Sequence, residues 1–60
     1  MSAVQIAEHA RALLDAYGDK AEAHAAKKAS ELRASGETAH AEQWTRVRNM
    51  ISEMRGSHVS

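Results

Sequence analysis

Four histidines in a chain of 60 residues raise the question of a metal site, because imidazole is a common ligand of zinc and other transition metals. Two histidines on one helix can share a zinc ion when they stand three or four positions apart on the same face. The histidines of this chain are 15 to 18 positions apart, at His9, His24, His40 and His58. The spacing therefore predicts no helical zinc pair.

The segment "ETAH" has the Glu-x-x-His form that carboxylate-bridged di-iron bundles use, with Glu37 and His40 as its ends. Such a centre needs two copies of the motif and two further inward-facing glutamates. This chain has one copy, at the start of a predicted helix, so capping or solvated side chains are the simpler interpretation. We expect no metal and no cofactor.

The sequence contains no arrangement typical of an enzyme. No Ser, His and Asp set lies beside a glycine-rich elbow, no glycine-rich phosphate loop is present, and there is no cysteine. We therefore expect no catalytic activity and no small-molecule substrate.

A nucleic-acid surface is suggested by "QWTRVRNM", where Trp44 stands beside Arg46 and Arg48. Helical spacing places Trp44 on one stripe with Val47 and Ile51, which favours a core position for the indole. Residues 27–51 also have the outline of a helix-turn-helix, but the second helix begins "ETAHAE", whose carboxylates would repel phosphate. With eight basic and eight acidic residues in balance, a small DNA-associated regulator of this type is the alternative function, not the preferred one.

The composition predicts an all-α fold. There is no proline, there are only three glycines, and residues of high helix propensity dominate. A single domain covers residues 1–60, and at this length only roughly 60% of the unfolded chain's surface is buried on folding. Without cysteine no disulfide can compensate, so association with a partner is expected.

The first helix is predicted over about residues 4–34, and Gly18 is the position at which it could break. The apolar stripe keeps its phase across Gly18, which favours one long helix with at most a kink. The segment "GDKAE" instead has the order of a helix stop and a new start, with Asp19 as N-cap and Glu22 three positions later. A mid-helix glycine costs only about 1 kcal/mol relative to alanine, so both alternatives stay open.

A second helix is predicted over about residues 37–55, after a turn at Gly36. Residues 56–60 are expected to form a frayed tail. Folding the two arms back on each other sets small residues of the first against large residues of the second. The expected pairs are Ala29 with Trp44, Ala25 with Val47, and Ala21 with Ile51.

This antiparallel hairpin leaves the beginning of a straight first helix without cover. The uncovered stripe is the predicted interaction surface, and it comprises Val4, Ile6, Ala10, Leu13, Leu14 and Tyr17. Two copies could bury these overhangs together, so the sequence predicts a homodimer that forms a four-helix bundle. The alternative is a monomeric three-helix bundle broken at Gly18.

The N-terminal segment has no basic region followed by a continuous apolar run, and no stretch approaches the roughly 20 apolar residues of a membrane span. We expect a cytoplasmic protein that does not enter the membrane.

The segments "YGDKAEAHAAKKASEL" and "SGETAHAEQWTRVRNMI" resemble short uncharacterised helical proteins of alphaproteobacteria. The resemblance covers about residues 12–55 and implies a bacterial, cytoplasmic origin. It implies no activity, cofactor or site. The expected function is therefore that of a small protein–protein interaction module, acting by self-association or by docking to a partner protein.

Overall fold

Two glycines with positive φ divide the chain into its helical elements, Gly18 and Gly36. The computed structural model describes residues 2–56. Its elements in chain order are α1 (Ala3–Tyr17), the 3-10 turn η1 (Gly18–Lys20), α2 (Ala21–Ala34) and α3 (Thr38–Gly56). The all-α prediction is confirmed. The frayed tail predicted over 56–60 lies outside the described residues, apart from Gly56, which is the last residue of α3.

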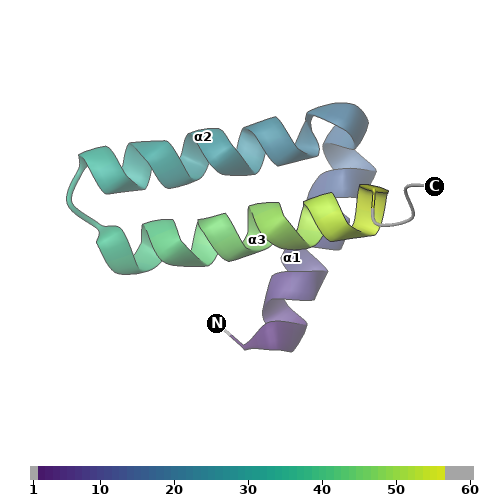
Figure 1. Ribbon diagram of the computed structural model, residues 1–60, viewed down its shortest axis with the longest axis horizontal. Coiled ribbons are helices and arrows are strands. Elements are labelled where there is room, and N and C mark those ends of the chain that lie inside the picture. The colour runs from purple at the N-terminus through teal and green to yellow at the C-terminus, as the bar shows by residue number, and fades with distance from the viewer. Residues whose placement is uncertain (1, 57–60) are drawn as a thin grey trace.

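Helices α2 and α3 form the predicted antiparallel hairpin and lie side by side in Figure 1. The turn between them follows the Schellman pattern. The Glu37 N–H donates to the Leu32 carbonyl at 2.8 Å, and the Gly36 N–H donates to the Arg33 carbonyl at 3.1 Å. Gly36 takes φ +87°, the left-handed conformation that this motif assigns to glycine.

The first helical arm is kinked at Gly18–Lys20. Gly18 has φ +56° and ψ −122°, the mirror image of extended backbone, which only glycine adopts readily. The Gly18 N–H still donates to the Leu14 carbonyl, and the Ala21 N–H donates to the Gly18 carbonyl. The chain thus leaves α1 in a hydrogen-bonded turn and enters α2 within three residues.

The predicted long first helix with a kink at Gly18 is confirmed, and the kink is sharp, so the straight form that the sequence also allowed is wrong. A straight helix over residues 4–34 would be about 46 Å long, whereas the longest dimension of the molecule is 38 Å. Figure 1 shows α1 crossing behind α3 at a steep angle instead of extending beyond the hairpin. The apolar stripe of α1 around Ile6 and Ala10 is therefore buried in the chain's own core, while the exposed first turn with Val4 is not covered.

The core lies where the three helices meet. Its buried residues are Ile6, Ala10, Ala21, Ala25, Ala29, Ala41, Val47 and Ile51. Five of these eight are alanines, and α2 contributes alanines alone. Ala21 and Ala25 belong to one cluster with Val47 and Ile51, in agreement with the predicted matching of small against large residues. Alanine on α2 lets α3 approach closely, and Ile6 closes the cluster from the side of α1.

Candidate interaction surface

An open hollow lies in the angle between α1 and α3. It has a volume of about 520 Å³ and is lined by Val4, Ala7, Glu8, Arg11, Ala12, Asp15 and Met54. Six of these seven residues come from the face of α1 turned away from Ile6 and Ala10, and Met54 comes from the last turns of α3. The kink at Gly18 creates the hollow, because it brings that face of α1 next to the end of α3.

The apolar part of this surface is exposed to solvent. Val4 is 68% exposed and Met54 is 38% exposed. Ala7 and Ala12 add short side chains that leave the helix backbone accessible to a neighbouring helix. Methionine adapts its shape readily to an apolar partner, so Met54 is suited to a contact surface of this kind.

The three charged residues of the hollow have no ion-pair partner within residues 2–56. These residues are Glu8, Arg11 and Asp15, and all three are exposed. Their charges are thus available to groups outside the chain.

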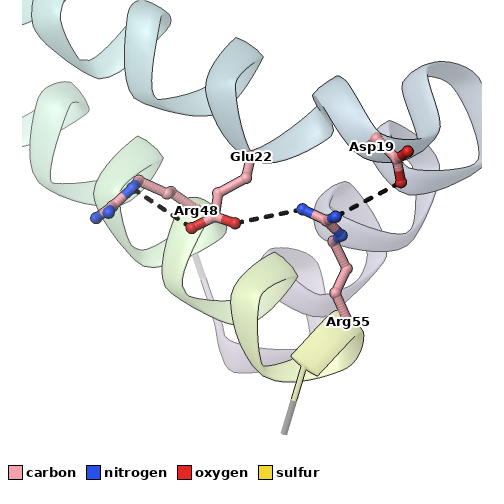
Figure 2. A network of polar contacts seen from close by, with 4 residues as sticks. All are labelled: Asp19, Glu22, Arg48 and Arg55. Atoms are coloured by element: carbon pink, nitrogen blue, oxygen red, sulfur yellow. Dashed lines mark hydrogen bonds and ion pairs between the residues drawn. The ribbon is translucent and has the colours of Figure 1, made fainter. Parts of the chain in front are cut away.

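Charges between α2 and α3 are arranged differently, as Figure 2 shows. The Glu22 carboxylate forms ion pairs with Arg48 at 4.0 Å and with Arg55 at 3.5 Å. Arg55 also reaches Asp19 at 3.5 Å. These contacts tie the end of α3 to η1 and the start of α2, next to the kink.

The structure divides the six residues of the sequence-predicted interaction surface into three groups. Ile6 and Ala10 are buried in the chain's own core, and Leu13 and Leu14 are half-buried against it. Val4 and Tyr17 are exposed, and of the six residues only Val4 lines the hollow. The Tyr17 ring stacks on the His24 ring of α2, with 4.3 Å between centroids.

Sequence reasoning missed most of the hollow. It did not consider Met54 as part of an interaction surface, nor the face of α1 that carries Glu8, Arg11 and Asp15. A signal was present, since these three charges and two alanines repeat at helical spacing opposite the apolar stripe. The spacing of these residues does not show that Met54 lies beside them, because it is the kink at Gly18 that brings Met54 and this face of α1 together.

Trp44 is half-buried against the core cluster, as its stripe with Val47 and Ile51 predicts. Its nearest aromatic neighbour is His9 of α1, edge to face at 6.0 Å between ring centroids. Of the two arginines beside it, Arg48 is paired with Glu22, and Arg46 lines a smaller hollow of about 320 Å³ with Ala3, Ile6, Asn49, Met50 and Glu53.

The other histidines make contacts of ordinary kinds. His40 lies 3.3 Å from Glu37 across the first turn of α3, and His24 stacks on Tyr17. His58 lies outside the described residues. Within the described part of the chain, no three residues of the metal-binding types come together.

No protein-family model, curated protein or solved structure matches this chain. Among the described helices, none is long and apolar enough to cross a membrane.

Proposed function

We propose that this protein is a small helical interaction module that binds another protein surface, by self-association or by docking to a partner, and that performs no catalysis. The observation that supports the proposal is the open hollow between α1 and α3, where the exposed side chains of Val4 and Met54 lie beside three charges that form no ion pair within residues 2–56.

The energetics of the core favour such a role. Among the buried residues of the described chain, Ile6, Val47 and Ile51 alone are larger than alanine. Larger side chains such as Leu13 and Leu14 are only half-buried, so the core buries little apolar surface for a domain of this size. Each Å² of apolar surface removed from water contributes about 25 cal/mol. A partner that covers Val4 and Met54 would therefore add to the stability of the chain, and Glu8, Arg11 and Asp15 would orient it.

The course of the helices weighs against the helix-turn-helix alternative over residues 27–51. That motif sets its two helices at about 90–120°, whereas α2 and α3 run antiparallel side by side (Figure 1). The chain also lacks an excess of basic residues that would attract phosphate, because its basic and acidic residues are equal in number.

A site-specific photo-crosslinker tests the proposal. A photo-reactive amino acid is placed at position 54 beside the hollow, and in a matched control at position 23, which is exposed on α2 away from it. Both forms are produced in cells that naturally make the protein and are irradiated there. We expect a discrete protein adduct from position 54 and none from position 23.

The proposal fails if position 54 yields no adduct above the background of position 23. It also fails if both positions yield the same set of adducts, because the attachment would then not depend on the hollow.

A further inference from the structure

We infer that the partner at the hollow is a second copy of the same chain, bound with the two α1 helices antiparallel about a two-fold axis level with His9 and Ala10. This inference rests on the proposed interaction function and names its partner. The contact uses the outer face of α1, opposite to the stripe that is buried in the core.

Charge complementarity carries the inference. In an antiparallel pair of identical helices, residues equidistant from the axis on opposite sides face each other. With the axis level with His9 and Ala10, each Glu8 faces the partner's Arg11, so the two-fold axis creates this opposite-charge contact twice. No ion pair within residues 2–56 uses Glu8 or Arg11, so both are free to make it.

The same register sets alanine against alanine and places Val4 of each copy opposite the partner's Asp15. Ala7 of each copy faces the partner's Ala12, which sets small residues against small ones on both sides of the axis. Packed helices lie about 8–10 Å apart, depending on the side chains at the contact, and alanine allows the short end of this range. Val4 and Met54 of each copy border the contact and lose water when it forms.

The length of α1 sets the strength of the association. Fifteen residues span about 22 Å at 1.5 Å per residue. Such a contact falls below the roughly 1,600 Å² of a standard stable interface. We therefore expect a reversible dimer with a dissociation constant of about 10⁻⁵ to 10⁻³ M.

Charge reversal tests the register. The variants are Glu8→Arg, Arg11→Glu and the double variant, and each is analysed by sedimentation equilibrium at concentrations up to about 2 mM, around the expected dissociation constant. Circular dichroism establishes that each variant is folded, as expected because both positions are exposed. Glu31→Arg on α2 makes the same change of charge outside the hollow and serves as the matched control.

The expected pattern is specific to the antiparallel register. Each single variant sets like charges opposite each other twice, so its self-association should weaken at least about tenfold. The double variant restores two opposite-charge contacts and should dimerise like the wild type. An equimolar mixture of the two single variants should form heterodimers at least as tight as the wild-type dimer. Glu31→Arg should leave the association unchanged.

Several outcomes would overturn the second copy as partner. These are a wild type that stays monomeric over the whole range, single variants that dimerise like the wild type, and a mixture that associates no better than its components. A monomeric wild type combined with a position-54 adduct to a different protein would overturn this inference and leave the proposed function standing. A monomeric wild type with no adduct would overturn both.

Discussion

The seam between α2 and α3 and the crossing of α1 over α3 are held by different means. Along the seam, α2 offers only alanines to the core, so the two helices approach closely over the length of α2. At the crossing, α1 is held by Ile6 and Ala10, by the half-buried Leu13 and Leu14, and by the conformation of Gly18. The α2 side of the seam is thus uniformly small and packs against the larger Val47 and Ile51 of α3, whereas the crossing depends on a few large side chains of α1 and one backbone geometry.

Ile51 belongs to both regions and should show the largest effect. Its side chain is fully buried and shares one cluster with Ile6 of α1 and Ala21 of α2. Ile51→Ala removes three carbon atoms from this cluster and should destabilise the fold by about 2–5 kcal/mol. We expect loss of the cooperative thermal transition measured by circular dichroism.

Val4→Ala is the control for Ile51→Ala, because Val4 is 68% exposed. It should change the free energy of unfolding by less than about 0.5 kcal/mol. Similar melting temperatures for the two variants would contradict the assignment of Ile51 to the core.

The α2 side of the seam is tested by Ala25→Leu. Ala25 is fully buried beneath α3, so a larger side chain must push the two helices apart at a cost of about 1–3 kcal/mol. Ala23→Leu, on the exposed side of the same helix, has the same change of propensity and should stay within about 0.5 kcal/mol of the wild type. Equal denaturation midpoints for the two variants would show that the seam tolerates larger residues.

The crossing alone is tested at Gly18. Gly18→Ala should destabilise by about 1–3 kcal/mol, because an L-residue is strained at φ +56° and ψ −122°. No atom lies within 4 Å of the position that a Cβ would take, so the effect is one of backbone torsion and not of collision. Hydrogen exchange should show the loss of protection in α1 first.

Chemical synthesis with D-alanine at position 18 isolates this torsional effect. The D-residue favours positive φ and should stabilise the fold by about 0.4–1 kcal/mol by restricting the unfolded chain. Gly56→Ala, at a glycine without positive φ, should be close to neutral. If the L-residue at position 18 is neutral, the kink does not require this conformation of glycine.

The smallest effect is expected at Arg55, which links the end of α3 to the kink through Glu22 and Asp19 (Figure 2). The Asp19 side chain is 99% exposed, so solvent screens that contact strongly. Arg55→Ala should cost at most about 1 kcal/mol, and less at high salt. Arg46→Ala, outside this network, is the control, and a salt-independent loss at Arg55 would point to packing instead of charge.

The seam could be predicted from the sequence because its signals are local and agree with one another. Arg33 in a last turn, Gly36 after it and a fresh helix start gave the turn. The alternation of alanines against Val47 and Ile51 then predicted the register, and Ala21, Ala25, Val47 and Ile51 do lie in one buried cluster.

The crossing could not be predicted because its signals conflict at Gly18. The apolar stripe keeps its phase through Gly18, yet the residues around it also read as a stop and a start. The free-energy difference between a continuous and a broken helix is about 1 kcal/mol, the cost of a glycine inside a helix. Packing of Ile6 against α3 easily exceeds this amount. The hollow could not be predicted for the same reason, because Met54 lies near Val4 only when the chain turns at Gly18.

The order in which the chain is synthesised determines when α1 can dock against α3. Helix α1 is made before α3, but the cluster that buries Ile6 and Ala10 includes Val47 and Ile51 of α3. About 45 residues separate Ile6 from Ile51, an interval of roughly 2–9 s at a translation rate of about 5–20 residues per second. During this time Ile6, Leu13 and Leu14 have no α3 to pack against. The hairpin needs only a short loop to close and should form as soon as α3 has been made, so α1 is synthesised before the hairpin and docks after it.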